Sequence, residues 1–251
     1  MRTREDTPGD DPTGPALACL HHLEQPFLGG AEAPLNKAGA RLDHRDRLAG
    51  DPLPDLDALD GIICFGGAQS ITEIDRHPYL LEEAELLRLA VARGIPVLGV
   101  CLGGQLLAHA LGGTVSRLPR RCVTWAELRH TAGDPLIDAL PDPVYALHWN
   151  EDALEPPPGA TELLERGGLG CAAFRFGSAW GVQFHPDVDG PTLEHWYATY
   201  GAWLTEAGID EAAARAADAR GLPGQQDLAD ALFGGFAELT RARAARARAP
   251  R

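Results

Sequence analysis

A cysteine in a glycine-rich stretch is the first candidate for chemistry in this sequence. Cys101 lies in GIPVLGVCLGGQLLAHALGG, after an apolar run and with glycines at positions 99, 103 and 104. A short apolar strand that ends at a cysteine and continues into a helix predicts a strand-to-helix elbow. Gly99 would let the backbone turn, and Gly103 and Gly104 would leave room for a substrate beside the sulfur. The N-terminus of the helix favours a thiolate, so Cys101 is predicted to be a nucleophile rather than a buried structural cysteine.

A thiol nucleophile needs a base, and nine histidines compete for that role. His185 stands out because, in AWGVQFHPDVDG, an apolar strand delivers it to a proline turn and Asp187 follows two positions later. An imidazole beside the thiol can hold it as a thiolate and later protonate a leaving amine, while a carboxylate fixes the tautomer of the ring. These residues predict a catalytic triad of Cys101, His185 and Asp187.

Acyl chemistry also needs backbone N–H donors for an oxyanion, each of which lowers the barrier by about 2.7 to 4 kcal/mol. The segment FGGAQS follows an apolar strand predicted over residues 61–65, which should lie beside the strand that ends at Cys101. The amide of Gly67 or Ala68 could then join that of Leu102 at one point. An ordinary Gly-Gly turn explains the pair equally well when it is taken alone.

The elements that must position these residues alternate between strand and helix. Near-continuous apolar strands are predicted from Ala16, over 61–65 and over 95–101, with helices over 78–94 and after Cys101. Such a succession predicts an α/β fold with an open, mostly parallel sheet covered by helices on both faces. Shorter β-like segments after Gly113 are typical of a meander appended to that sheet.

Three regions are expected along the chain. Residues 1–15, rich in Asp, Pro, Gly and Thr, predict a disordered leader. Residues 16–204 form the expected compact domain, which closes with a helix whose apolar face includes Trp196, Tyr197 and Tyr200. Residues 205–251 predict a helical C-terminal extension, broken at GLPG and ending in an Ala/Arg-rich tail.

Composition excludes several classes of function. Asp and Glu outnumber Lys and Arg by 36 to 22, and a net charge of -14 disfavours nucleic acid and anionic lipid as partners. No apolar run approaches the roughly 20 residues of a membrane span, and the N-terminus lacks the apolar centre of a secretory signal, so a cytoplasmic protein is expected. The five widely spaced cysteines argue against a disulfide framework, and the absence of a CxxC pair gives no indication of zinc. No metal or organic cofactor is expected.

The motifs together resemble the class I glutamine amidotransferase family, in particular the amidotransferase domain of GMP synthetase. The matching features are Gly66 and Gly67, the elbow GVCLGGQLLAHALGG and the segment WGVQFHP, in the family's order over roughly residues 16–204. The resemblance implies a flavodoxin-like fold of that type, in which Cys101 attacks the side-chain amide of glutamine and forms a γ-glutamyl thioester. It also implies a set of substrate-binding residues: Gly66, Gly103, Gln105, Trp149 and Asn150. Gln105 could otherwise be a helix surface residue, and Trp149 a core residue.

The sequence departs from the family's pattern at several positions. Gly104 stands where members commonly carry His or Tyr, Asp187 stands in place of Glu, and WNED at 149–152 replaces a Ser/Trp-His-Gly-Asp segment. Glu151 could repel an α-carboxylate or attract an amine, or it could be a solvated loop charge. His21 and His22 follow the first strand, where ligands often bind in open α/β sheets, and are either pocket or loop residues.

Three functions remain open from the sequence. The first is hydrolysis of the glutamine side-chain amide, with ammonia passed to a separately encoded synthetase or other acceptor enzyme. The second is hydrolysis or transfer of another γ-glutamyl amide, which Gly104 and Glu151 favour. The third is a non-catalytic regulatory or scaffold protein, against which the retention of Cys101, His185 and a following carboxylate argues.

Overall fold

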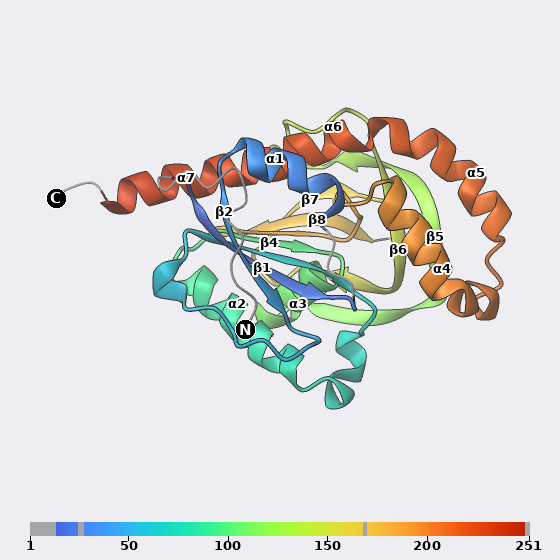
Figure 1. The fold of residues 1–251 in the computed structure, drawn as a ribbon, viewed down its shortest axis with the longest axis horizontal. Coiled ribbons are helices and arrows are strands. Elements are labelled where there is room, and N and C mark those ends of the chain that lie inside the picture. The colour runs from blue at the N-terminus through green and yellow to red at the C-terminus, as the bar shows by residue number, and fades with distance from the viewer. Residues whose placement is uncertain (1–13, 25–27, 168–169, 249–251) are drawn as a thin grey trace, which may run out of the picture.

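The computed structural model describes residues 14–24, 28–167 and 170–248. The predicted leader therefore lies outside the described residues, except for Gly14 and Pro15. Within the described part of the chain, one nine-stranded sheet runs through the molecule with helices on both of its faces (Figure 1).

The strand order is β2-β1-β3-β4-β9-β8-β7-β5-β6. The first five strands in this order pair in parallel, and the remaining four continue the sheet in antiparallel pairs. The sheet is thus mixed: a parallel half carries the elbow, and an antiparallel half extends it. In chain order the strands are Ala16–His22 (β1), Arg41–Asp46 (β2), Gly61–Gly67 (β3), Val97–Val100 (β4), Thr114–His130 (β5), Val144–Glu155 (β6), Thr161–Glu165 (β7), Cys171–Phe176 (β8) and Ala179–Val182 (β9).

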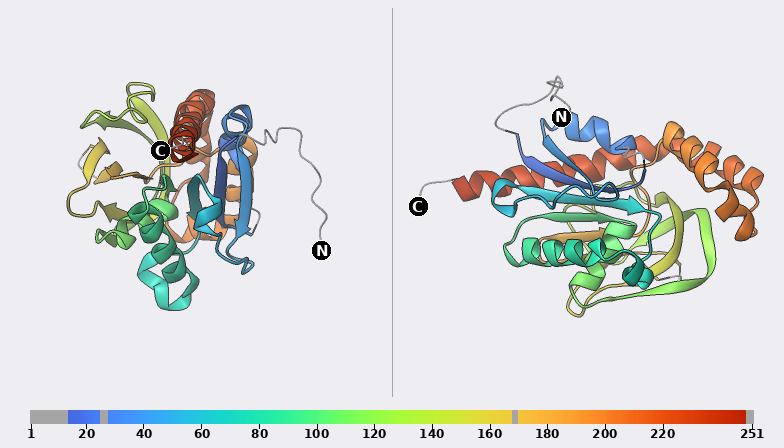
Figure 2. Two further views of the ribbon diagram at one scale, coloured as in Figure 1. Left: turned by 90° about the vertical axis from the view of Figure 1, so that its left-hand side faces the viewer. Right: turned by 60° about the horizontal axis from the view of Figure 1, so that its bottom comes forward.

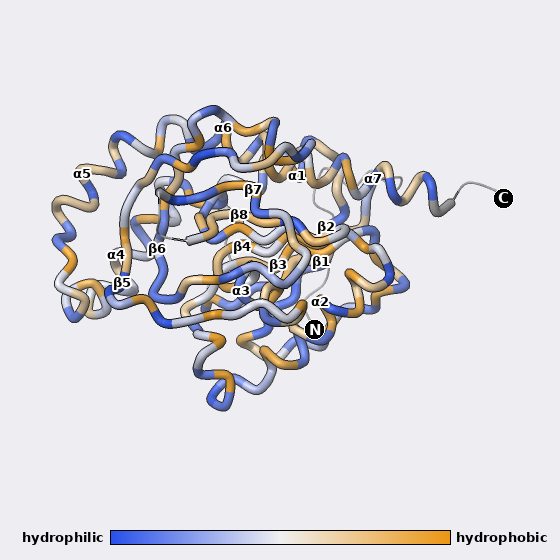
Figure 3. The backbone as a smooth tube through the Cα atoms, turned by 180° about the vertical axis from the view of Figure 1, so that it is seen from behind, coloured by the Kyte–Doolittle hydropathy of each residue, from blue (hydrophilic) through white to orange (hydrophobic). Residues whose placement is uncertain are grey.

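The central strands are apolar on both sides because both faces of the sheet are covered. In β3, Ile63 and Phe65 belong to one hydrophobic core, whereas Ile62 and Cys64 belong to a second core on the opposite face. This alternation follows the two-residue period of a strand. Figure 3 shows hydrophobic residues concentrated along these central strands and polar residues frequent in the outer loops.

The helices divide between the two faces (Figures 1 and 2). Helices α2 and α3 pack on the core that contains Ile62, while α1, α6 and α7 cover the core that contains Ile63. Helix α4 packs with the β5–β6 hairpin in a third cluster. The helices are Glu32–Lys37 (α1), Tyr79–Ala92 (α2), Leu102–Ala110 (α3), Gly190–Glu206 (α4), Glu211–Gly221 (α5), Gln225–Ala229 (α6) and Gly235–Arg248 (α7).

The C-terminal region is helical, as predicted, and it contributes to the core. Leu228, Phe233 and Phe236 are at most 2% exposed and pack on the sheet beside Trp180. The predicted break at GLPG is a short 3-10 turn, Leu222–Gly224, and a π-helical turn, Asp230–Gly234, joins α6 to α7. In the left-hand view of Figure 2, α7 is seen nearly end-on between the two halves of the sheet.

Two strands, β2 and β7, and one helix, α1, were not predicted from the sequence. The edge strand β2 has the sequence RLDHRD, whose charges hide the β pattern but suit an edge that must not pair further. Strand β7 and the six-residue helix α1 are short. The segments expected as separate strands over 114–130 form the single strand β5, whose pairing with β6 shifts register between Arg117 and Cys122. No helix within the described ranges is long and apolar enough to cross a membrane.

Candidate active site

The predicted elbow is present where β4 meets α3. Cys101 has φ 51° and ψ -106°, and among the described residues it alone combines a positive φ with a side chain. A non-glycine residue is strained in this region of φ/ψ space, and such strain is concentrated at functional sites. The strained turn places the sulfur at the N-terminus of α3, where the helix dipole favours negative charge.

The glycines around Cys101 serve the packing of the elbow. A Cβ at Gly99 would lie 2.4 Å from the Gly103 carbonyl oxygen, and one at Gly103 would lie 1.9 Å from the Cys64 carbonyl oxygen. A Cβ at Gly104 would meet the Val182 carbonyl at 2.7 Å. Gly103 and Gly104 therefore let α3 approach β3 and β9, and neither lines the cavity beside the thiol. The prediction that Gly103 and Gly104 leave room for a substrate is wrong, because a Cβ atom at either position would meet backbone atoms of a neighbouring strand.

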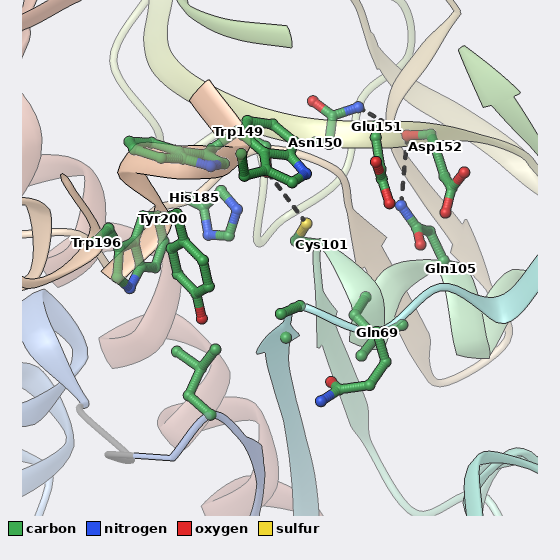
Figure 4. Close-up of a pocket in the computed structure, with 15 residues that line it drawn as sticks. Gln69, Cys101, Gln105, Trp149, Asn150, Glu151, Asp152, His185, Trp196 and Tyr200 are labelled. Carbon is green, nitrogen blue, oxygen red and sulfur yellow. Dashed lines mark hydrogen bonds between the residues drawn. The ribbon is translucent and has the colours of Figure 1, made fainter. Parts of the chain in front are cut away.

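The thiol contacts a side chain that follows β9 and a backbone carbonyl of β6. The Cys101 sulfur is 3.6 Å from Nε2 of Gln183, which can donate a hydrogen bond to it. It is 3.9 Å from the Trp149 carbonyl oxygen (Figure 4). Cys101 is 5% exposed. A buried amide N–H directed at the sulfur stabilises the thiolate over the thiol.

His185 is held rigidly by its backbone and by Asp187. Its N–H donates to the Leu147 carbonyl at 2.8 Å, and its carbonyl accepts from Gln225 Nε2 at 2.8 Å. Nδ1 of the ring lies 3.3 Å from Oδ1 of Asp187, and both residues are buried. Nε2 has no hydrogen-bond partner of normal geometry among the described residues, and the charge of the Cys101 sulfur acts on the ring.

The charges of the site act strongly on His185. Burial lowers the pKa of His185, but the negative charge of the Cys101 sulfur and the hydrogen bond to Asp187 outweigh burial and raise the pKa to about 10. The His185 ring is therefore protonated at neutral pH and carries its positive charge next to the Cys101 sulfur.

Asp187 is fixed by a turn that the sequence analysis did not single out. The Gly30 N–H donates to the Asp187 carbonyl at 2.8 Å. Gly29 has φ +52°, and a Cβ at this position would lie 2.0 Å from the same carbonyl oxygen. The turn Gly29–Ala31 therefore sets the position of the carboxylate, and only glycine fits at its start.

The Gly-Gly segment lies beside the Cys101 elbow. Strand β3 pairs with β4, with Cys64 opposite Gly99. A Cβ at Gly66 would lie 3.1 Å from Cε1 of His185 and 3.5 Å from Cβ of Cys101, so a side chain would crowd both residues. Gly67, Ala68 and Leu102 all line the cavity that holds the Cys101 thiol.

One side of this cavity is polar. Gln105 is buried, and its Nε2 donates to Gln183 Oε1 at 3.3 Å and to the Asp152 carbonyl at 3.4 Å. The Asn150 side chain donates to the same carbonyl at 2.7 Å, while its Oδ1 has no partner within the described chain; nor has Oε1 of Gln69. Two buried amide oxygens are thus left as acceptors at the cavity wall.

The two carboxylates of this wall are paired. Glu151 forms ion pairs with Arg117 and, at 2.9 Å, with Arg121; Arg117 also contacts Asp152 at 3.3 Å. The Ser70 hydroxyl donates to Asp152, whose pKa burial raises. Glu151 therefore lines the cavity as a largely neutralised group rather than as a free loop charge.

The other side of the cavity is aromatic. Trp149, Trp196, Tyr200 and Trp203 line it together with Leu23. Trp149 packs edge-to-face on Trp196 at 5.5 Å and stacks with Trp203 at 6.2 Å, so it serves as cavity wall and as core at once. Trp196 and Tyr200 are predicted from the sequence to lie on the buried face of a helix. Their spacing of four residues, with Trp203 three further on, is the signal for a shared wall.

His21 and His22 lie outside this cavity. Both line a smaller adjoining cavity that Asp187 also borders. His22 contacts Glu83 at 2.6 Å, and Arg47 pairs with the same carboxylate at 2.9 Å. Ligand atoms of His22, Cys64 and Glu83 lie within 4.8 Å of one another. Because Glu83 is already paired with a cation and burial raises the pKa of Cys64 well above its usual value, the cluster is better suited to a buried ion pair than to a metal.

Comparison with known proteins agrees with this geometry. The family model of class-I glutamine amidotransferases matches residues 43–198. A GMP synthase (glutamine-hydrolyzing) of Caldicellulosiruptor saccharolyticus is 31% identical over 189 residues, which are 70% of this chain and 35% of that protein. The glutamine amidotransferase-like protein YfeJ of Salmonella typhimurium is 35% identical over 158 residues, which cover 58% of this chain and 64% of that protein. The chain thus spans about a third of the length of the first of these relatives.

Solved structures share the fold. A glutamine amidotransferase from Thermotoga maritima superposes with a TM-score of 0.81 at 24% identity, covering 90% of this chain and 98% of that one. One from Methylobacillus flagellatus superposes with a TM-score of 0.75 at 22% identity, covering 90% and 94%. The mixed sheet and its helices are therefore a known arrangement.

Proposed function

Because the chain belongs to the class I glutamine amidotransferase family, we propose that it hydrolyses the side-chain amide of glutamine through a γ-glutamyl thioester on Cys101. The observation that carries the proposal is the strained Cys101 elbow beside a His185 ring that Asp187 orients. The three side chains have the roles of nucleophile, acid–base and orienting group.

In the first half of the reaction the Cys101 thiolate attacks the amide carbonyl carbon. The carbonyl oxygen becomes an oxyanion that the backbone N–H groups of Leu102 and of Gly67 or Ala68 would stabilise. Protonated His185 gives its proton to the amide nitrogen, the C–N bond breaks, and ammonia leaves. The γ-glutamyl group stays on the sulfur as a thioester.

In the second half water replaces ammonia. His185, now neutral, takes a proton from the water, and the oxygen attacks the thioester carbonyl. The C–S bond breaks, glutamate leaves, and the thiolate–imidazolium pair forms again. One amide and one water thus give one glutamate and one ammonia.

The γ-glutamyl part of the substrate fits the polar side of the cavity. The unpartnered oxygens of Asn150 and Gln69 can accept hydrogen bonds from the α-ammonium group, and Gln105 lines the same cavity. Gly66 supports the site by leaving space for the catalytic pair, whereas Gly103 contributes only packing.

The ammonia would pass to an acceptor enzyme. The relatives named GMP synthase are much longer than the matched region, and the solved structure of PurLQS from Thermotoga maritima contains a chain of similar fold, with a TM-score of 0.53 at 17% identity. These likenesses favour a synthetase as the acceptor enzyme. Both proteins would then work in the same cell compartment.

A diazoketone that mimics glutamine tests the proposal. The folded protein should gain one covalent adduct on Cys101, detected by intact mass and peptide mapping, and should release ammonia and glutamate from glutamine. Cys101→Ala should do neither while keeping the wild-type circular dichroism. A folded wild-type protein with no adduct and no glutamate release would instead indicate a scaffold that retains the fold.

A further inference from the structure

The thiol divides its cavity into two chemically different halves (Figure 4). Gln105, Asn150 and Asp152 lie on one side of Cys101, and Trp149, Trp196 and Tyr200 lie on the other, around His185. A single substrate that spans the thiol must therefore have a polar end and an apolar end.

The position of His185 determines which half of the cavity receives the leaving group of the substrate. The imidazole must protonate the leaving nitrogen, so the leaving group lies next to the ring. Trp196 packs edge-to-face on this ring with 4.8 Å between centroids, and Trp149 packs on Trp196 at 5.5 Å. The amine that leaves is thus released against the aromatic half, while the amino-acid end lies in the polar half.

The aromatic half is larger than ammonia requires. Trp149, Tyr200 and Trp203 are each only partly buried, so their rings remain available to a ligand. An unsubstituted amide would leave these faces in contact with water, whereas an apolar substituent on the nitrogen would cover them and gain the free energy of apolar burial.

The charges of the aromatic half disfavour a cationic substituent. The Arg121 guanidinium lies over the Trp203 ring at 4.9 Å, and it also pairs with Glu151. The cation–π position on Trp203 is therefore taken, and the two carboxylates among the described residues that line the cavity, Glu151 and Asp152, are already paired with arginine. An ammonium group beside Trp203 would meet the Arg121 guanidinium.

We propose that the preferred substrate is a γ-glutamyl amide whose nitrogen carries an uncharged alkyl or aryl group, which Trp149, Trp196, Tyr200 and Trp203 bind. This inference rests on the proposed cysteine-dependent hydrolysis and specifies its leaving group. The thiolate attacks the amide carbonyl, His185 protonates the substituted nitrogen, and the C–N bond breaks to release a primary amine. Water then cleaves the thioester, so one amide and one water give glutamate and the amine.

The test compares four substrates by the common product, glutamate. The substrates are glutamine, γ-glutamyl butylamide, γ-glutamyl benzylamide and γ-glutamyl 4-aminobutylamide. For the wild-type protein, kcat/KM should be at least about tenfold higher for the butyl and benzyl amides than for glutamine, which is the scale of discrimination that apolar pockets provide. The 4-aminobutylamide should be a poorer substrate than the butylamide of nearly the same shape.

Variants of the aromatic residues test whether the aromatic half causes the preference for apolar amides. Trp203→Ala should reduce the benzylamide-to-glutamine ratio of kcat/KM about tenfold, and Tyr200→Ala provides a second measurement should the first variant fold poorly. Tyr145→Ala removes a partly exposed aromatic ring outside the cavity and should leave the ratio unchanged.

Each contrary result has a distinct meaning. Faster cleavage of glutamine than of both apolar amides would overturn this proposal and leave the hydrolase function intact. Preference for the 4-aminobutylamide would overturn it in favour of a cation-binding subsite. No glutamate from any of the four, with Cys101 unlabelled by the diazoketone, would overturn the proposed function as well.

Discussion

Asp187 Oδ1 lies 3.3 Å from Nδ1 of His185, and this contact keeps Nε2 of the ring directed away from the carboxylate. The carboxylate is one methylene shorter than a glutamate, yet the turn Gly29–Ala31 holds its backbone close enough for the contact. The orientation of the His185 ring thus depends on a turn more than 150 residues away in the sequence.

Asp187→Asn should reduce kcat by about tenfold or more, because the amide can no longer stabilise the imidazolium or fix its tautomer. Asp187→Glu keeps the charge and should retain more activity than the asparagine variant. Steady-state kinetics with glutamine or with γ-glutamyl butylamide measures kcat for both variants, and circular dichroism tests whether each variant is folded. Equal rates for the asparagine variant and the wild type would remove Asp187 from the triad.

The protonation of His185 should depend on Cys101. Since its pKa is raised to about 10, the ring should stay protonated at neutral pH and lose its proton only as the pH rises toward that value. In Cys101→Ala the negative charge is gone and burial acts against the imidazolium, so the midpoint should move to lower pH. Titration of the ring by NMR measures the shift; an unchanged midpoint would show that the sulfur is not its charge partner.

Gln183 should assist the nucleophile. Its Nε2 is 3.6 Å from the Cys101 sulfur, and hydrogen bonds to charged groups contribute roughly 1.5 to 3 kcal/mol. Gln183→Leu should therefore slow alkylation of Cys101 by iodoacetamide, by about tenfold. The exposed Asn36, an amide side chain on α1, changed to Leu, is the control and should react as the wild type does. Unaltered alkylation of Gln183→Leu would rule out this contribution.

Gly103→Ala should destabilise the fold. The new methyl group would lie 1.9 Å from the Cys64 carbonyl oxygen, and backbone cannot move aside as a flexible side chain can. We expect a loss of at least about 2 kcal/mol in the free energy of unfolding, measured by urea denaturation. Gly201→Ala is the control, because its Cβ would meet nothing within 4 Å and alanine favours the helix.

The C-terminal region should be required for stability. Phe236 is fully buried and packs edge-to-face with Trp180. Phe236→Ala should cost about 3 to 5 kcal/mol in the free energy of unfolding, whereas Leu81→Ala, at a side chain that is 52% exposed, should cost little. A negligible effect of Phe236→Ala would mean that α7 is peripheral to the fold.

Local patterns were sufficient for the elbow and for the parallel strands apart from β2. Apolar strands that end at glycines, followed by helical periodicity, predicted β1, β3, β4, α2 and α3 close to their observed bounds. Strand β2 was missed because its charges reflect its edge position, which is a property of the sheet. Gly103 and Gly104 were predicted to leave room for a substrate, but they leave room for neighbouring backbone. A sequence shows that a side chain is absent, but not which atoms lie where that side chain would be.

The sequence by itself determined the reactive groups: a cysteine at a strand-to-helix turn, a histidine at the end of a late strand and a carboxylate two residues later. Such signals are local, since they depend on residues a few positions apart. Only the tertiary structure decided what surrounds those groups, because α4 and the β5–β6 hairpin form the cavity of the thiol, and the Gly29–Ala31 turn holds Asp187, through contacts between residues far apart in the chain. The division of the cavity into a polar and an aromatic half is a product of those contacts.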